Sequence, residues 1–334
     1  MRFLLDAEQR EFAASLYAML TAADTPSVVR DWSRGDHASG HALWRRIAEA
    51  GVFSLAIPEA YEGLGPRPVE LALAFVELGR HAVPGPLVET VTAAALLASL
   101  DDTGPAKRLL PALASGESAA TVATGTYALD ADMADVRLTL SARLGVGGES
   151  SPTRTPTELR LAPPPGPPRP SLDPARRLFS TSHGGELLAI DPPLPPALLI
   201  ARLTTAAQAL GVGLALLDRT VAYVKQRTQF GVPIGSFQAV KHQLADAKIA
   251  LEFARPLVLG AAVTMAPEDV AAAKVTACEA AYATARTALQ LHGAIGYTAE
   301  YDLSLWLTKA RALRTAWGSP GECRDTVLSG GRRW

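Results

Sequence analysis

The distribution of proline is the feature that most constrains this chain. About half of its 25 prolines fall between Pro152 and Pro196. Proline has no backbone N–H and disrupts helix interiors and central strands, so this stretch is restricted mainly to loops and short, interrupted strands. On either side of it, apolar residues recur every three or four positions, as they do in amphipathic helices. The pattern predicts a helical region, a small β region and a second helical region.

The N-terminal region, residues 1–115, is predicted to be a helical domain. Apolar residues repeat at helical spacing around Leu16 and Ile47 and again from Val69 to Gly79. Gly51 is placed to end the second of these helices. Between the second and third helices, residues 55–65 carry too many glycines and prolines for a helix, so they are predicted to form a loop.

The middle region, residues 116–196, is predicted to be an abbreviated β domain. Four segments have the composition of short strands: Ala119–Ala123, Arg137–Ala142, Glu158–Ala162 and Glu186–Ile190. The proline run from Pro163 to Pro168 is expected to be an extended connection at the surface.

The C-terminal region, residues 197–334, is predicted to be a helical bundle that drives oligomerisation. Four long stretches show helical periodicity: Ala197–Arg227, Ser236–Met265, Pro267–His292 and Glu300–Trp317. Long helices joined by short connections favour an up-and-down four-helix arrangement. The expected fold class is therefore mainly α with a small β domain.

Charge and cysteine content exclude several classes of function. Lys and Arg total 32 and Asp and Glu total 33, so no basic excess favours nucleic acid or an anionic membrane. Two cysteines, Cys278 and Cys323, both in segments of helical pattern, are too few for a disulfide framework or a cysteine-built metal site. No metal site is expected. This cysteine content makes the cytoplasm the expected location. The longest apolar stretches are shorter than a membrane span, so no membrane anchor is expected.

Two sequence blocks resemble a known family. Residues 227–246 read RTQFGVPIGSFQAVKHQLAD, and residues 290–301 read QLHGAIGYTAEY. Both are similar to conserved segments of flavin-dependent acyl-CoA dehydrogenases, and the resemblance is strongest between Arg202 and Arg324. Weaker similarity covers the loop from Pro58 to Gly65, which resembles the P-E-x-x-G-G-x-G loop of that family, and the segment from Leu172 to Arg177.

The resemblance implies FAD as the cofactor. An arginine at a helix end suits bidentate pairing with a pyrophosphate, and Arg227 occupies such a position. Phe230 is placed either to cover a ring of the cofactor or to lie in the core, and Gly293 and Gly296 either allow a close backbone approach to a ligand or end a helix. By analogy with the family, the block that begins at Gln290 meets FAD across a subunit interface. The other expected cofactor-binding residues are Gln229, Phe237, Gly318 and Ser319.

The chain departs from the family at the catalytic base. The reaction requires a carboxylate that removes an α-proton from an acyl thioester. Most members place a Glu before a Gly-Thr/Ser pair, and the corresponding residue here is Trp317. A minority place it on the first bundle helix, where this chain has Ala201 beside Arg202. Neither residue can accept the proton, so the base is unknown. Arg202 is the expected substrate-binding residue, and a structural salt bridge at a subunit interface is the alternative role for it.

The β region departs from the family as well. Members usually bring a T/S-E-P segment and a W-x-I/T strand against the flavin ring, whereas this chain reads VATGT at residues 122–126. Asp130, Asp132 and Asp135 follow. Their alternation favours a solvated strand or turn over a metal site. Flavin-ring contacts are therefore less well supported by the sequence than pyrophosphate contacts.

Three hypotheses follow. The chain is the base-lacking partner of a second acyl-CoA dehydrogenase-family chain in a heterotetramer, resembling the paired subunits that oxidise CoA thioesters of steroid side chains. Alternatively, it is a self-sufficient homotetramer that uses another carboxylate, such as Glu322 or Glu300. The third hypothesis is a descendant of the fold that binds a CoA ester or a partner without redox chemistry. For the enzymes, the expected partners are an acyl-CoA substrate and an electron-transfer flavoprotein.

Overall fold

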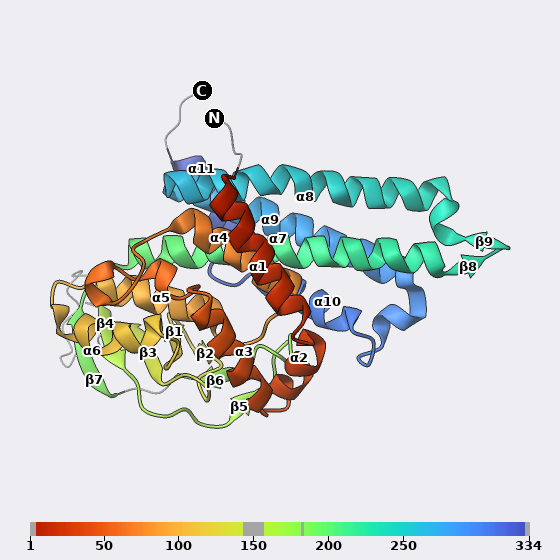
Figure 1. Ribbon diagram of the computed structural model, residues 1–334. Coiled ribbons are helices and arrows are strands. Elements are labelled where there is room, and N and C mark those ends of the chain that lie inside the picture. The colour runs from red at the N-terminus through yellow and green to blue at the C-terminus, as the bar shows by residue number, and fades with distance from the viewer. Residues whose placement is uncertain (1–4, 143–156, 182–183, 331–334) are drawn as a thin grey trace, which may run out of the picture. The chain divides into compact units, whose positions relative to one another are not determined.

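The computed structural model describes residues 5–142, 157–181 and 184–330. The chain divides into two compact units whose elements are labelled in Figure 1. Unit 1 comprises Met1–Arg34, Pro68–Val83 and Arg202–Trp334, and unit 2 comprises Gly35–Arg67 and Pro84–Ala201. Each unit is therefore assembled from segments that lie far apart in the sequence.

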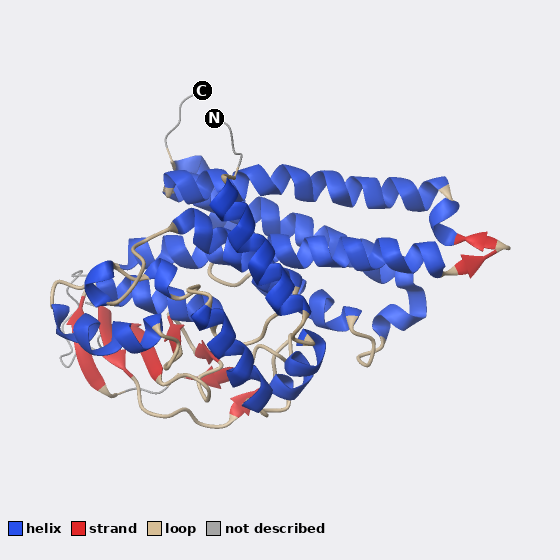
Figure 2. Ribbon diagram, in the orientation of Figure 1, coloured by secondary structure: helices blue, strands red, loops and turns tan. Residues whose placement is uncertain are grey.

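Unit 1 is dominated by helices (Figure 2). Helix α9 contacts α8, α10 and α11, and a two-stranded hairpin connects α7 to α8. The elements are α1 (Ala7–Thr21), α2 (Thr25–Ser33), α4 (Pro68–Arg80), α7 (Leu194–Gln226), β8 (Thr228–Gln229), β9 (Val232–Pro233), η3 (Ile234–Ser236), α8 (Gln238–Thr264), α9 (Pro267–His292), η4 (Gly293–Tyr297), α10 (Leu303–Leu313) and α11 (Pro320–Ser329). The first residues of α7, up to Ala201, fall in unit 2.

The core of unit 1 combines small and large side chains. Alanines of α7 and α9 pack with Leu216, Trp306 and Leu313, all of them buried. The Trp306 indole N–H donates to the Arg80 backbone carbonyl at 2.9 Å, and the Arg219 guanidinium lies 3.8 Å from the indole ring centroid. Small residues let neighbouring helices approach closely, and Trp306 satisfies its polar atom while its ring fills the core.

Helices α4 and α7 touch backbone to backbone. A Cβ atom added to Gly211 of α7 would overlap the carbonyl oxygen of Val76, and one added to Gly79 of α4 would overlap the carbonyl oxygen of Gln208. Two glycines, one on each helix, thus make reciprocal contacts. This contact joins the N-terminal helix α4 to the C-terminal bundle within unit 1.

Unit 2 combines helices with two small sheets. Its helical elements are α3 (Ala38–Glu49), η1 (Ser54–Ala56), η2 (Glu59–Tyr61), α5 (Leu87–Ala98) and α6 (Thr103–Ala114). The four-stranded sheet has the order β1-β3-β4-β7 and the three-stranded sheet the order β2-β6-β5. The strands are β1 (Ala120–Ala123), β2 (Tyr127–Leu129), β3 (Val136–Ala142), β4 (Thr157–Leu161), β5 (Pro168–Arg169), β6 (Leu178–Ser180) and β7 (Glu186–Ile190). Pro168 lies on an edge strand, where a missing N–H is tolerated.

Helix α7 is long and apolar enough to cross a membrane by length and composition alone. Of the most apolar window of α7, 78% is buried inside the protein. Such burial is typical of the central helix of a helical bundle.

The expected fold class, mainly α with a small β region, is confirmed. All four predicted C-terminal helices are present, and α9 has the predicted bounds, Pro267–His292. Helix α11 adds a fifth, and it starts with a capping box in which Ser319 and Glu322 bond each other's backbone N–H. The three predicted domains, 1–115, 116–196 and 197–334, stay predictions.

Candidate functional site

The first group of predicted site residues lies around the hairpin between α7 and α8. Arg227 follows the last residue of α7, Gln229 lies in β8, and Phe237 directly precedes α8. Phe230 is 92% exposed and has a left-handed backbone, with φ 54°. Its ring meets Phe237 edge to face, at 6.3 Å between centroids. We call Arg227, Gln229, Phe230 and Phe237 the hairpin cluster.

The second predicted block lies at the same end of the bundle. Gln290 is in the last turn of α9, Gly293 caps that helix and Gly296 is buried in η4. His292 stacks on Tyr223, which precedes Arg227 by one helical turn, at 4.1 Å between ring centroids. The Tyr223 hydroxyl also donates to the His292 backbone carbonyl at 3.4 Å. This stack, which sequence reasoning missed, joins the end of α9 to the end of α7.

The surroundings of His292 determine its charge. In the structure the imidazole is buried, and burial lowers its pKa, which favours the neutral ring. Nδ1 lies 2.7 Å from the Ala288 backbone carbonyl, so Nδ1 carries the proton and donates it.

The remaining predicted residues of the bundle gather at a turn between α10 and α11. Arg202 of α7 donates from Nε to the Trp317 carbonyl at 3.2 Å. Lys274 of α9 donates from Nζ to the Gly318 carbonyl at 2.7 Å and to the Arg314 carbonyl at 3.4 Å. Trp317 has a left-handed backbone, with φ 57°. We call Arg202, Lys274, Trp317 and Gly318 the turn cluster.

Lys274 was not recognised from the sequence. Its side chain is 1% exposed, yet within the described residues it makes no ion pair with a carboxylate. Burying an ammonium group is costly unless hydrogen bonds compensate, and here the carbonyls beyond the C-terminal end of α10 accept from it. Two cations thus hold consecutive carbonyls of the turn, which fixes the conformation of Trp317 and Gly318.

Cys278, one turn beyond Lys274, is expected to resist alkylation in the folded protein. Burial raises the pKa of its thiol to about 11, so almost no thiolate is present at pH 8. Iodoacetamide at pH 8, followed by peptide mass spectrometry, should leave Cys278 unmodified until the protein is unfolded in urea. Rapid labelling of the native protein would contradict the buried position of this thiol.

Neither position expected for the catalytic base carries a carboxylate. Ala201 is buried in α7, and the turn cluster presents an indole at residue 317. Glu322 lies nearby, but its carboxylate accepts the Ser319 backbone N–H at 2.6 Å as part of the capping box. Hydrogen bonds from the backbone and side chain of Ser319 lower the pKa of Glu322, which makes this carboxylate a weaker base.

The hairpin and turn clusters lie far apart. Arg202 and Arg227 are separated by 25 residues, nearly all of them in α7. At the rise of an α-helix this corresponds to roughly 37 Å. In Figure 1 the hairpin lies at one end of α8 and α11 lies at the other. The predicted site residues therefore form two groups, not one.

The three aspartates of unit 2 have structural roles. Asp130 is fully buried and accepts the Arg177 backbone N–H, Asp132 pairs with Arg177 at 2.7 Å, and Asp135 accepts the Ala119 backbone N–H. The expectation of a solvated position was therefore wrong for Asp130. Among the described residues, no group of three or more His, Cys, Asp or Glu could hold a metal ion.

Unit 2 also contains an open cavity of about 400 Å³ beside the segment that replaces the T/S-E-P motif. Its lining includes Gly125 and Arg160, and it is rich in hydroxyl groups, those of Thr126, Thr139, Ser141, Ser180 and Thr181. Arg160 is already engaged there, by Glu158 at 2.8 Å and by the Gly185 carbonyl at 2.9 Å. Apart from Arg160, the lining residues that the structure describes offer neutral hydrogen-bonding groups and no carboxylate.

The hairpin cluster has the groups that a dinucleotide pyrophosphate requires. The Arg227 side chain is exposed and has no hydrogen bond or ion pair within the described residues. It is therefore available for bidentate pairing with phosphate oxygens. Phe230, three residues further along the hairpin, is 92% exposed and offers an aromatic face. These residues fit the diphosphate end of FAD, whereas the turn cluster does not provide the carboxylate that the oxidation requires.

Comparisons with known proteins agree with these features. Residues 6–117 match the acyl-CoA dehydrogenase N-terminal domain, and residues 196–328 match the acyl-CoA dehydrogenase C-terminal domain. The acyl-CoA dehydrogenase IpdE2 of Mycobacterium tuberculosis is 34% identical over 319 residues, which cover 94% of this chain and 95% of that protein.

Two solved structures of similar fold are complexes by title. The Tcur3481-Tcur3483 steroid ACAD, a G363A variant, has a TM-score of 0.81 and 25% identity, covering 97% of each chain. The ChsE4-ChsE5 complex from Mycobacterium tuberculosis has a TM-score of 0.84 and 22% identity, and the match covers 100% of each chain.

Proposed function

Because the chain belongs to the acyl-CoA dehydrogenase family, we propose that it is the subunit without a catalytic base in a heteromeric, FAD-dependent enzyme that desaturates a CoA thioester. One observation carries this proposal. The two family positions for the base hold Trp317 and Ala201, while Arg227 is exposed and unpaired within the described residues. A partner chain of the same family would supply the carboxylate and complete a heterotetramer.

In the proposed complex, the hairpin cluster and the end of α9 bind the cofactor. Bound FAD supplies the acceptor for the hydride that leaves the β-carbon of the thioester. Arg227 pairs with the pyrophosphate, and Phe230 covers a ring of the same cofactor. Gln290, Gly293 and Gly296, at the same end of the bundle, bring backbone close to it. This end would meet the cofactor across a subunit interface.

Arg202 is the proposed substrate-binding residue. Its Nε is engaged by the Trp317 carbonyl, but its two terminal NH₂ groups have no hydrogen-bond partner within the described residues. These groups are available to a polar group on the acyl substrate. Gly318 and Ser319, held by the same turn, remain the proposed cofactor contacts at this end.

The substrate and partners are proposed from the relatives. A similar solved structure is titled a steroid ACAD, so we assign the chain an acyl group derived from a steroid side chain. Electrons would pass to an electron-transfer flavoprotein, the acceptor that membership of the family implies. The proposed location is the cytoplasm.

The proposal is tested by expressing the chain alone and together with a neighbouring family gene. Colour, from flavin absorbance near 450 nm, and dehydrogenase activity are expected only after co-expression. A yellow, active protein from the single chain would favour a self-sufficient homotetramer. A colourless complex that binds a CoA ester would favour the non-redox descendant. Either result would overturn the proposed role.

Glu322 is not expected to serve as the base. A Glu322→Gln variant should keep the dehydrogenase activity of the co-purified complex within about twofold, since the carboxylate belongs to the helix cap and its pKa is lowered. The matched variant Glu300→Gln removes another exposed carboxylate. It should also keep the dehydrogenase activity within about twofold. A loss of activity of more than about a hundredfold in either variant, with thermal stability retained, would support the homotetramer instead.

A further inference from the structure

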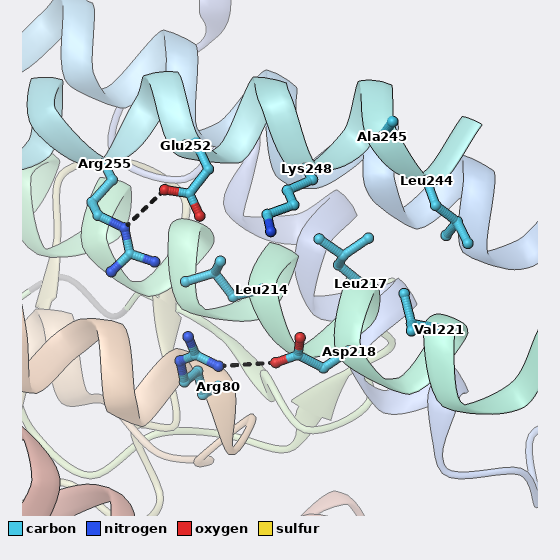
Figure 3. A pocket seen from close by; sticks show the side chains of 10 residues that line it. All are labelled: Arg80, Leu214, Leu217, Asp218, Val221, Leu244, Ala245, Lys248, Glu252 and Arg255. Carbon is cyan, nitrogen blue, oxygen red and sulfur yellow. Dashed lines mark hydrogen bonds and ion pairs between the residues drawn. The ribbon is translucent and has the colours of Figure 1, made fainter. Parts of the chain in front are cut away.

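Unit 1 contains an open cavity of about 500 Å³ between α7 and α8 (Figure 3). None of its lining residues belongs to the hairpin cluster or to the turn cluster. Its size lies within the range of small-molecule sites, about 300–1,000 Å³. The proposed dehydrogenase function gives this cavity no role.

The cavity has a charged end and an apolar end. In Figure 3, Arg255 and Glu252 lie at one end, and Leu244 and Val221 lie at the other. Leu217 and Ala245 extend the apolar part. A molecule that fills such a site must carry a polar head and a hydrocarbon body, because burying either part against the wrong end is unfavourable.

Two of the three cations of the cavity are already paired. Arg80 lies 3.1 Å from the Asp218 carboxylate and 3.7 Å from that of Glu77, and Arg255 lies 3.7 Å from that of Glu252. Asp218 and Glu252 line the cavity and each pairs with one guanidinium group, whereas Glu77 is not among the lining residues. The lining therefore keeps one positive charge without a carboxylate partner, and this charge favours an anionic ligand.

That remaining charge is Lys248 of α8. Its side chain points into the cavity, towards α7. Within the described residues its ammonium makes no hydrogen bond and no ion pair. Glu252, one helical turn further along α8, is a possible competitor for this ammonium, and it is engaged with Arg255. Because opposite charges attract, a single unpaired ammonium beside apolar side chains favours a ligand that carries one negative charge.

From this arrangement we infer that the cavity binds a small amphiphilic carboxylate. Its head group pairs with Lys248, and its hydrocarbon part lies along Leu217 and Val221 of α7, towards Leu244 of α8. The α7 residues that line the cavity, from 214 to 221, span about 10 Å of helix, so an extended chain of about eight carbons fits the length of the cavity. An aliphatic monocarboxylate such as octanoate has both features.

The test uses isothermal titration of the full-length chain with sodium octanoate and with 1-octanol, which has the same chain without the charge. Lys248→Met keeps the length and apolar character of the side chain and removes the ammonium. This variant is expected to bind octanoate at least tenfold more weakly than the wild type and to bind 1-octanol equally well. Glu252→Gln removes the competing carboxylate, so it is expected to bind octanoate more tightly.

The matched control is Lys241→Met, an exposed lysine near the start of the same helix and outside the cavity. It should bind octanoate as the wild type does. The inference is overturned if the wild type does not bind octanoate. It is also overturned if Lys248→Met binds octanoate as well as the wild type, or if Lys241→Met loses as much affinity as Lys248→Met.

Discussion

A Gly211→Ala variant is expected to lose about 3 kcal/mol or more of folding free energy. The added methyl group would overlap the Val76 carbonyl oxygen where α4 and α7 meet, and neither backbone can move without separating the two helices. The opposing Gly79 makes the same kind of contact with Gln208, so a shift that relieves one clash disturbs the other. Thermal unfolding followed by circular dichroism should show a midpoint lowered by roughly 5 °C or more.

The control for this prediction is Gly321→Ala in α11. A Cβ atom there would meet only the Ser319 hydroxyl oxygen, at an ordinary 3.8 Å. Alanine is a better helix former than glycine, so this variant should be as stable as the wild type or slightly more stable. A Gly211→Ala protein as stable as the wild type would mean that α4 and α7 do not touch as described.

An Arg227→Ala variant is expected to release flavin from the co-purified complex. A charge-assisted hydrogen-bonded contact contributes about 1.5–3 kcal/mol, equivalent to roughly 10–100-fold in affinity. The side chain is exposed and makes no contact that supports the fold within the described residues, so the thermal midpoint of the flavin-free protein should not change. Flavin absorbance after gel filtration measures the loss.

Two further variants sharpen this prediction. Arg227→Lys keeps the charge but loses the planar, bidentate geometry, so its flavin affinity should fall between those of wild type and Arg227→Ala. Lys225→Ala removes a neighbouring exposed cation at the end of α7 and should retain flavin fully. Full flavin content in Arg227→Ala would remove the hairpin cluster from the cofactor site.

The sequence predicted the long helices well because their signals are local. Pro267 at the first turn and Gly293 after the last turn mark both ends of α9, and the structure places the helix between them. Strands β2, β5 and β6 contain only two or three residues each, too few for any alternation to be recognised. The start of α11 could have been predicted, because Ser319 is followed three residues later by Glu322, which is a capping-box pattern.

The sequence could locate the residues of the candidate site but not their grouping. Lys274 stands among alanines of α9, and only the fold brings the Gly318 carbonyl to its ammonium. The stack of Tyr223 on His292 likewise joins two helices whose contact no local pattern reveals. The absence of a carboxylate at residues 201 and 317 could be predicted from the sequence, because it depends only on which residues occupy those positions.

The contact between Gly79 and Gly211 also affects how the chain folds during synthesis. Helix α4 leaves the ribosome more than a hundred residues before its partner surface on α7 exists, a delay on the order of ten seconds. Until then, the part of α4 that packs against α7, around Val76 and Gly79, lacks its partner. Chaperones that bind nascent apolar helices should therefore raise the yield of this protein. Truncated chains that end before residue 211 should aggregate instead of folding as smaller domains.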